Sequence, residues 1–238
     1  MQLFYCKEIG EGFCTLDAEE SRHAVRVLRL KEGDAVHVTD GQGALMQGVV
    51  AVADERACTV QIVCVERRDV VQAGLHLAVA PTKNPSRMEW LVEKAVEVGV
   101  GEITLLQCDH SERVFMKTDR LERLAVSAMK QSLHTVLPRI NPVVKLRDWF
   151  HSPLSTLHSP LKLIAHCEAG QPRTPIAEVL LPGRNATILI GPEGDFSPEE
   201  IDMALHCGYV PVSLGPSRLR TETAALYAAC AFNLINDK

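Results

Sequence analysis

The sequence predicts an α/β protein in which a small β-rich domain precedes a larger domain with a parallel sheet. Residues 1 to about 70 consist mainly of short apolar runs rich in β-branched side chains, as in strands. From Leu75 onward such runs alternate with amphipathic helical segments. That alternation is typical of a parallel sheet covered by helices on both faces. We therefore expect domains at 1–70 and 74–238, with residues 67–74 as a linker.

The N-terminal strands are expected at 2–6, 35–40, 44–53 and 57–66. The turn signal Asp40-Gly41-Gln42-Gly43 separates the second run from the third. Short strands at this spacing favour a small barrel.

A helix is expected between Glu19 and Leu30 in this β-rich region. Its arginines, Arg22, Arg26 and Arg29, follow i, i+4, i+7 spacing and should share one face. Such a face is either a solvated charged surface or a contact to an RNA phosphate backbone, and both interpretations stay open.

The C-terminal strands are expected at 75–80, 103–107, 161–166, 187–190 and 210–214. The first helix between them should begin with Ser86 as N-cap and Glu89 completing a capping box, and end before Gly99. Its buried face should hold Met88, Leu91, Val92 and Ala95. Further helices are expected at 119–132, 175–181 and 221–235.

Composition excludes several classes of protein. No apolar run approaches the ~20 residues of a membrane helix. The N-terminus lacks the basic region and apolar core of a secretory signal, so we expect a cytoplasmic protein. Eight cysteines occur without a CxxC pair, which predicts no metal site of the zinc-ribbon kind. The net charge of −5 argues against wholesale nucleic-acid binding but permits local basic patches.

The stretch 188–227 contains two apolar runs, each followed by a glycine loop and then a helix. Ser197 with Glu200 forms a capping-box signal in the first unit. Two such units side by side predict a ligand crevice at the carboxyl ends of parallel strands. The loops match neither GxGxxG nor GxxxxGK[ST], and no GxSxG or HExxH occurs. Pro192 and Pro216 remove backbone donors, which suits an apolar or stacked ligand better than a pyrophosphate.

IGPEGDFSPEE at 190–200 and LGPSRLRTETAAL at 214–226 closely resemble the two signature segments of the ribosomal RNA small subunit methyltransferase E family. The resemblance covers essentially the whole chain, through HAVRVLRLKEGD (23–34), Lys83 with RMEWLVEKAVEVGV (87–100), SERV (111–114) and the QS of MKQS (129–132). Two positions depart from the family pattern. Asp195 stands where GPEGG is common, and MKQSLHTVLP (129–138) replaces an EQSGR-like stretch, with Lys130 as its basic residue. The first departure should be harmless if position 195 needs no positive φ, a region that Asp tolerates better than most residues.

The resemblance implies an enzyme of the SPOUT class that methylates N3 of a uridine in 16S ribosomal RNA with S-adenosylmethionine, acting on the small subunit. It also implies a deep trefoil knot in the C-terminal domain, a PUA-like barrel that binds RNA at the N-terminus, and a homodimer formed through the methyltransferase domain.

The same resemblance implies three groups of site residues. The cofactor pocket would involve His166, Leu189, Ile190, Gly191, Glu193, Gly194, Leu214, Gly215, Leu219 and Thr223. His166 would be a ligand contact, a base or a spacer. Catalysis would fall to Arg220, stabilising uridine charge, and Glu222, orienting that arginine or accepting the proton; the alternative is a salt bridge between them that pins the knot. RNA contacts would come from Arg22, Arg26, Arg29, Lys83, Arg87 and Arg113.

Two other functions compete with this one. The first is a SPOUT methyltransferase with a different RNA target. The second is a non-catalytic RNA-binding assembly factor that keeps the fold, against which the two intact glycine-loop segments argue.

Overall fold

The computed structural model describes residues 2–10, 12–67, 74–152, 161–168 and 170–236, and the chain divides into two compact units. The first takes in residues 1–71 and 126–137, the second 72–125 and 138–238. Residues 126–137 thus belong to the first unit, whereas the sequence analysis assigns them to the second domain. Residues 68–73 of the predicted linker lie outside the described residues.

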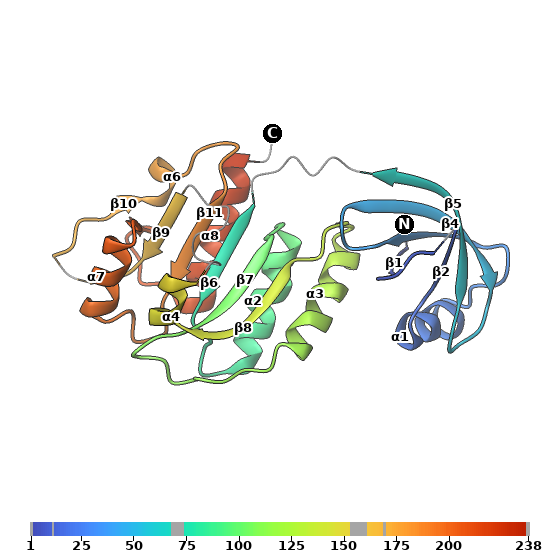
Figure 1. Cartoon of the computed structure of the whole chain (residues 1–238), viewed down its shortest axis with the longest axis horizontal. Coiled ribbons are helices and arrows are strands. Elements are labelled where there is room, and N and C mark those ends of the chain that lie inside the picture. The colour runs from blue at the N-terminus through green and yellow to red at the C-terminus, as the bar shows by residue number, and fades with distance from the viewer. Residues whose placement is uncertain (1, 11, 68–73, 153–160, 169, 237–238) are drawn as a thin grey trace. The chain divides into compact units, whose positions relative to one another are not determined.

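The described strands of the first unit form a five-stranded sheet in the order β1-β3-β4-β5-β2 (Figure 1). Its strands are β1 (Leu3–Tyr5), β2 (Phe13–Thr15), β3 (Ala35–Thr39), β4 (Ala44–Val52) and β5 (Thr59–Arg67). β1 runs parallel to β3 and the other neighbours are antiparallel. Phe4, Leu16, Val38, Met46 and Val60 are among the buried core side chains.

The sheet is curled, and Gly48 shows why glycine is needed for the bend. The pairing of β4 with β5 shifts register between Gln47 and Gly48, as at a β-bulge. A Cβ at Gly48 would lie 2.4 Å from Val60 Cγ1 and 2.8 Å from the Gln61 carbonyl oxygen. The strands therefore approach too closely there for any other residue. The small-barrel prediction corresponds to this curled sheet.

The helix of the first unit is shorter than predicted. Asp17 caps α1 (Ala18–Arg22) by accepting the backbone N–H groups of Glu19 and Glu20, and a π-helical turn η1 (His23–Val27) follows. Arg29 lies beyond the helix, with a φ of 58°. The prediction that three arginines share one helical face is therefore wrong for Arg29, because the chain leaves the helix at Leu28. Arg22, Arg26 and Arg29 are all exposed.

The described strands of the second unit form a seven-stranded parallel sheet in the order β10-β12-β9-β11-β6-β7-β8. They are β6 (Leu75–Val79), β7 (Glu102–Gln107), β8 (Arg139–Lys145), β9 (Leu161–Ala165), β10 (Thr174–Pro175), β11 (Ala186–Ile190) and β12 (Val210–Ser213). β7 and β8 lie to one side of β6, and the later strands lie to the other. The order therefore reverses beside β6, where open α/β sheets bind ligands.

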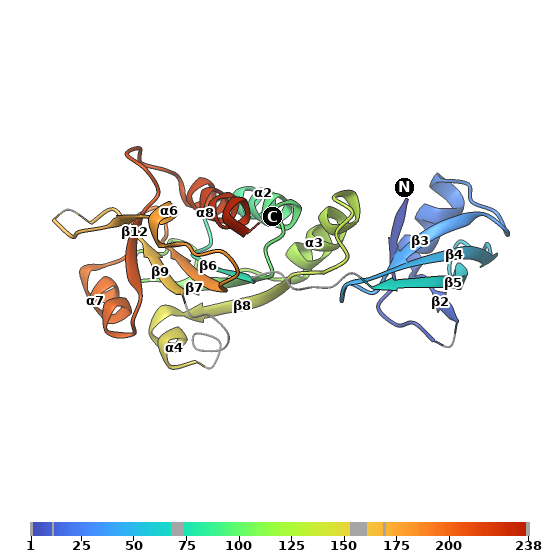
Figure 2. The same cartoon turned by 90° about the horizontal axis from the view of Figure 1, so that it is seen from above.

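Helices cover both faces of this sheet (Figure 2). On one face lie α2 (Pro85–Glu97) and α8 (Thr221–Asn236), with α6 (Ile176–Val179) near α8. On the other lie α4 (Leu146–His151) and α7 (Pro198–His206). The capping box predicted for Ser197 and Glu200 opens α7. Within the described ranges, no helix is long and apolar enough to span a membrane.

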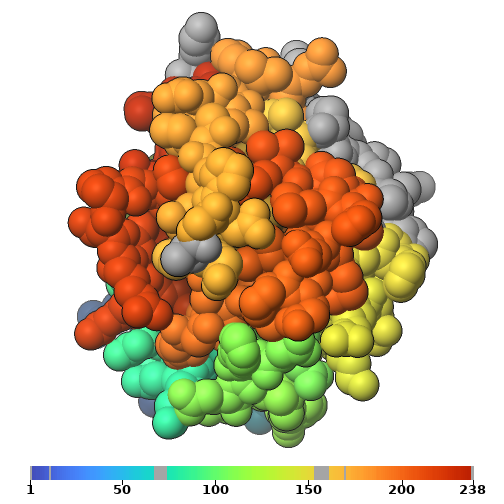
Figure 3. Space-filling view, turned by 90° about the vertical axis from the view of Figure 1, so that its left-hand side faces the viewer, coloured from blue at the N-terminus to red at the C-terminus, as the bar shows by residue number. Residues whose placement is uncertain are grey.

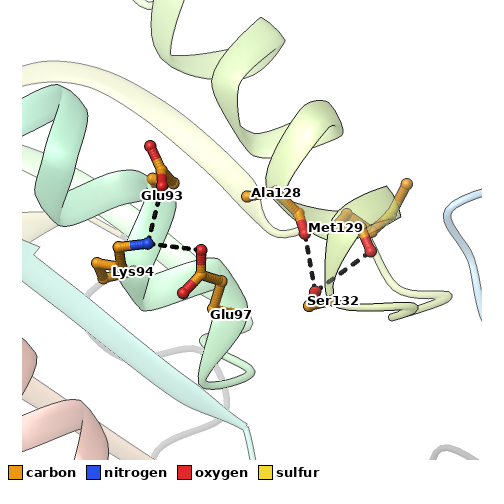
Figure 4. A network of polar contacts seen from close by, with 6 residues as sticks. All are labelled: Glu93, Lys94, Glu97, Ala128, Met129 and Ser132. Atoms are coloured by element: carbon orange, nitrogen blue, oxygen red, sulfur yellow. Dashed lines mark hydrogen bonds and ion pairs between the residues drawn. The ribbon is translucent and has the colours of Figure 1, made fainter.

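Helix α2 begins two residues earlier than predicted. Asn84, not Ser86, is the N-cap: its side chain accepts the Ser86 N–H at 3.0 Å, and Pro85 takes the first helical position. The predicted Ser86–Glu89 capping box is therefore wrong, because Pro favours the first helical position and shifts the start of the helix. On the solvent side, Lys94 Nζ lies 2.8 Å from both Glu93 Oε1 and Glu97 Oε1 (Figure 4).

Helix α3 (Asp119–Gln131) matches its predicted range. At its end Ser132 Oγ donates to the carbonyl oxygens of Ala128 at 2.8 Å and Met129 at 3.2 Å (Figure 4). The same carbonyl oxygens also accept backbone N–H groups, from Ser132 and His134 respectively, so the serine hydroxyl adds a second donor at the end of the helix.

Trp149 and Tyr209 form a polar contact inside the core beneath α4 and α7. Trp149 is fully buried, and its indole Nε1 donates to the Tyr209 hydroxyl at 3.0 Å. Burial raises the pKa of the Tyr209 phenol to about 12.

This phenol gives a pH-dependent test of the core. Because the folded pKa lies above the unfolded one, the stability linked to Tyr209 is complete below pH 10 and is lost as the pH rises through 12. Between pH 10 and 12, the free energy of unfolding should fall about 2–3 kcal/mol further in the wild type than in Tyr209→Phe. Urea denaturation at each pH measures this, and parallel pH profiles of the two proteins would contradict it.

Candidate active site at the carboxyl edge of the parallel sheet

The segment 191–200 connects the loops at the carboxyl edge of the sheet through three carboxylates. Glu193 Oε1 accepts the backbone N–H of Lys83 at 3.0 Å, in the loop after β6. Asp195 Oδ2 accepts that of Cys167 at 2.6 Å, after β9. Glu200 Oε1 accepts that of Asp109 at 2.8 Å, after β7. Hydrogen bonds to ionised acceptors are roughly twice as strong as neutral ones, so these carboxylates hold three loops against one segment.

Side chains reinforce the same junction. His110 Nδ1 lies 3.1 Å from the carbonyl oxygens of both Gly194 and Asp195. Arg113 donates from Nε and Nη2 to the Lys83 carbonyl oxygen at 3.2 and 2.9 Å. In Figure 3 the turquoise, green and orange-red segments that contain these loops lie side by side on one face of the molecule.

Asp195 has a φ of 65°, so this position does require the left-handed region. Aspartate in place of the common glycine is expected to be harmless if position 195 needs no positive φ. The structure shows that it does need one. Its carboxylate compensates for the strained backbone, since Oδ1 accepts the Phe196 N–H at 2.9 Å while Oδ2 holds Cys167. Asp is among the few residues that visit this region with local hydrogen bonds.

A cavity of about 70 Å³ opens between the loops after β9 and β12. Four predicted cofactor residues line it, namely His166, Leu214, Gly215 and Leu219. The sequence prediction left out the other lining residues, which are Ala165, Cys167, Arg173, Val212, Ser213, Ser217 and Ala224. Of these, Ser213 and Ser217 flank the predicted glycine loop. Their place in the sequence was therefore a signal from which they could be predicted as lining residues.

His166, which lines this cavity, carries an unsatisfied donor. The imidazole is buried, and burial lowers its pKa, so the ring is neutral near pH 7. The Glu168 N–H donates to Nδ1 at 3.3 Å, which assigns the remaining proton to Nε2. Nε2 is buried without a hydrogen-bond partner among the described residues. A buried donor of this kind needs an acceptor, which a water molecule or a ligand supplies.

The other predicted cofactor residues lie outside the lining of the cavity. Leu189 and Ile190 are buried in β11, and Gly191 follows them. The Gly191 carbonyl oxygen accepts from Thr221 Oγ1 at 3.1 Å, which fixes the start of α8. Glu193 and Gly194 belong to the loop junction, and Thr223 is exposed on α8.

The two predicted catalytic residues are not paired with each other. Glu222 is buried in the first turn of α8, and its Oε1 lies 3.6 Å from Nε of Arg87 in the first turn of α2. Its Oε2 is buried and has no hydrogen-bond partner in the described part of the chain. Arg220 is exposed just before α8. The alternative of an Arg220–Glu222 salt bridge is therefore wrong, since Arg87 takes that place.

Three predicted RNA contacts lie at or beside the loop junction, with different surroundings. Lys83 Nζ pairs with Glu112 at 2.7 Å, Arg87 is half-buried against Glu222, and Arg113 donates to backbone. Lys130 forms an ion pair with the buried Glu20 in the first unit, so it supplies no free charge. Among the described residues no group of His, Cys, Asp and Glu that could hold a metal ion occurs.

Comparisons with known proteins identify the family. A family model for an RNA methyltransferase domain matches residues 71–233, and one for an RNA methyltransferase PUA domain matches residues 16–63. The chain belongs to the RNA methyltransferase family. The resemblance found in the sequence is confirmed, as are the α/β fold and the N-terminal PUA domain.

The relatives of this RNA methyltransferase cover nearly its whole length. The crystal structure of a probable rRNA-methyltransferase from Porphyromonas gingivalis is 40% identical, with a TM-score of 0.90 over 100% of this chain and 99% of that one. The ribosomal RNA small subunit methyltransferase E from Neisseria gonorrhoeae, solved bound to S-adenosyl methionine, is 25% identical, with a TM-score of 0.81 over 99% and 98%. The enzyme of that name from Buchnera aphidicola is 26% identical over 222 residues, 90% of this chain and 85% of its own.

Asp195→Gly should free the loop after β9 while leaving the segment 191–200 in place. Glycine adopts the positive φ without strain, so the loss is confined to the side-chain bonds with the Cys167 and Phe196 N–H groups, of which only the first reaches another loop. A hydrogen bond to a charged group contributes about 1.5–3 kcal/mol, which predicts roughly 10- to 100-fold faster amide exchange at 166–168. Hydrogen–deuterium exchange with mass spectrometry measures the rate. Asp195→Asn keeps an acceptor, so its amide exchange rate should lie between those of the wild type and Asp195→Gly. Unchanged protection of residues 166–168 in Asp195→Gly would show that the hydrogen bond from Cys167 to Asp195 does not hold this loop.

Proposed function

We propose that this RNA methyltransferase transfers a methyl group from S-adenosylmethionine to N3 of a uridine in 16S ribosomal RNA, within the small subunit. The observation that carries the proposal is the buried Glu222 carboxylate, which has one unpartnered oxygen beside the glycine loops. Uridine N3 carries a proton and is a poor nucleophile until that proton leaves. A buried acceptor without a partner suits this reaction, because the N3 proton needs an acceptor as the methyl group is transferred.

The residues around the cavity suit a nucleoside cofactor. His166 offers a buried Nε2–H, Leu214 and Leu219 offer apolar walls, and Gly215, with a φ of 104°, leaves open space on the side where a Cβ would stand. The cavity of about 70 Å³ is smaller than the ~300–1,000 Å³ of typical ligand pockets. We propose that the loops at 166–168 and 214–219 separate when a cofactor enters. When bound, the cofactor supplies an electrophilic methyl group.

Glu222 serves as the proton acceptor in this proposal. Arg87 holds Oε1 from one side, which leaves Oε2 as the atom that takes the N3 proton. General bases must lie within hydrogen-bond reach of the proton they remove, and Oε2 has no competing donor among the described residues. The half-buried guanidinium of Arg87 also keeps the Glu222 side chain in one position.

Arg220 stabilises the uridine anion in this proposal. It is exposed, lies two positions before Glu222, and has no acidic partner in the part of the chain that the structure describes. A free guanidinium can donate to O2 or O4 of the uracil ring, where charge develops as the N3 proton leaves.

We further propose two features that the family resemblance implies for this chain, a trefoil knot in the C-terminal domain and a homodimer formed through that domain. We also propose a cytoplasmic location. The domain boundaries 1–70 and 74–238 belong to the same proposal. The predicted RNA contacts Arg22, Arg26 and Arg29 are supported by their exposure on the PUA unit.

The proposed reaction is tested with purified protein, labelled S-adenosylmethionine and small ribosomal subunits that lack the modification. Digestion and mass spectrometry then identify the labelled nucleoside. Label in N3-methyluridine at one site supports the proposal. Label in another RNA or on a ribose would contradict the substrate while keeping the enzyme class. Binding of S-adenosylmethionine without transfer to any RNA would favour an assembly factor.

Glu222→Gln should abolish turnover while leaving the cofactor bound. The amide keeps the shape and a contact to Arg87 but cannot take the N3 proton, so kcat should fall about 10²- to 10⁴-fold. The affinity for S-adenosylmethionine, measured by titration calorimetry, should stay within about twofold. Glu199→Gln, an exposed carboxylate in the first turn of α7, is the matched control and should retain the wild-type rate. A Glu222→Gln enzyme with near wild-type kcat would eliminate Glu222 as the base.

Arg220→Ala should lower kcat about 10²- to 10³-fold, the loss typical of removing one donor to a developing oxyanion. Arg218→Ala removes an exposed arginine from the same loop and should retain the wild-type kcat. Initial rates at saturating cofactor and subunits measure both. Equal losses in the two variants would indicate a general effect of loop charge instead of a specific role for Arg220.

A further inference from the structure

The loop between β7 and α3 exposes two adjacent apolar side chains that the proposed mechanism does not use. Val114 is 55% exposed and Phe115 is 67% exposed. Single exposed apolar residues are common on protein surfaces, but an exposed phenylalanine beside an active-site edge is a candidate for contact with a ligand. The loop starts at the carboxyl end of β7, the edge of the sheet at which the glycine loops lie.

The N-terminal half of this loop is held in one conformation. Ser111 closes a tight turn with Cys108, because its N–H donates to the Cys108 carbonyl oxygen and its Oγ accepts the Cys108 N–H. His110 contacts the segment 191–200, and Arg113 donates twice to the Lys83 carbonyl oxygen. Phe115 therefore follows two residues after an anchored position, which lowers the entropic cost of ordering it on a ligand.

The charges beside Phe115 favour an anionic partner. Arg113 donates from Nε and Nη2 to a backbone oxygen. Within the described residues its guanidinium forms no ion pair with an acid. Lys117 is exposed and has no ion pair in the described ranges. Lys83, by contrast, is neutralised by Glu112. An aromatic residue with a cation not neutralised by an acid two positions away on each side in the sequence suits unpaired RNA, whose bases stack on aromatic side chains while its phosphates meet Lys and Arg.

We propose that Phe115 stacks on a base of an unpaired ribosomal RNA nucleotide next to the target, with Arg113 and Lys117 at the adjoining phosphates. The inference rests on the proposed methyl transfer to ribosomal RNA, but not on which atom of the target receives the methyl group. It assigns Phe115 to substrate positioning, because Phe115 is not among the residues that line the cofactor cavity.

The test compares Phe115→Leu with Phe115→Tyr in steady-state methylation of unmodified subunits. Leucine keeps an apolar side chain without a π-face, and tyrosine keeps the ring. Stacking of one base predicts that Phe115→Leu raises KM for the subunits about 5- to 100-fold, with kcat at saturating subunits and the Kd for S-adenosylmethionine within about twofold. Phe115→Tyr should restore KM to within about threefold of the wild type.

Equal KM values for the leucine and tyrosine variants would overturn the proposal. A loss of self-association in sedimentation, with KM unchanged, would overturn it by assigning the patch to a second copy of the chain. If wild-type protein methylates no subunit, the proposed function fails separately. Fluorescence anisotropy with an unmodified, single-stranded ribosomal RNA fragment then tests stacking on its own, and equal affinity of wild type and Phe115→Leu would refute it.

Discussion

The carboxyl edge of the parallel sheet depends on backbone N–H groups that need acceptors. Each loop after a strand leaves donors that the ladder no longer satisfies, and unsatisfied donors are costly where water is excluded. In this chain Glu193, Asp195 and Glu200 supply the acceptors, one for each of three loops. Because all three lie within one segment, its position fixes the loops after β6, β7 and β9 together. These three acids therefore hold the loops together.

Glu222 differs from those carboxylates in its partners. It is buried, as Glu200 is, whereas Glu193 is exposed and Asp195 is half-buried. One Glu222 oxygen meets a guanidinium, and the other has no partner among the described residues. A buried polar atom without a partner costs stability and needs an explanation, of which a catalytic role or a ligand is one. His166 Nε2 presents the same anomaly on the cavity wall. One free acceptor and one free donor at the same edge of the sheet fit a site that takes up a proton and a ligand.

Local signals in the sequence predicted the elements whose stability is local. The capping box at Ser197 and Glu200 and the range of α3 both appear as expected. Elements that depend on tertiary contacts were missed. β8 contains Asn141 and Pro142, which argue against a central strand but are tolerated at a sheet edge, where β8 lies. β2 has three residues and α4 six, too few for a period to be visible. Arg29 followed helical spacing, but its backbone had already left the helix.

The roles of the site residues could be predicted from the sequence even less well than the fold. Sequence can mark Glu193, Asp195, Glu200 and Glu222 as acids near glycine loops, but it cannot rank them, because each role is set by a partner from a distant part of the chain. Arg87 lies in the first turn of α2, with no local pattern to link it to Glu222 in α8. The position of Asp195 is instructive, since a residue that departs from the common glycine brings both the strain of a positive φ and the carboxylate that bonds Cys167. Aspartate in place of glycine thus costs backbone freedom at position 195 and adds a hydrogen bond between two loops. The sequence does not reveal this bond, because Cys167 and Asp195 come together only in the folded structure.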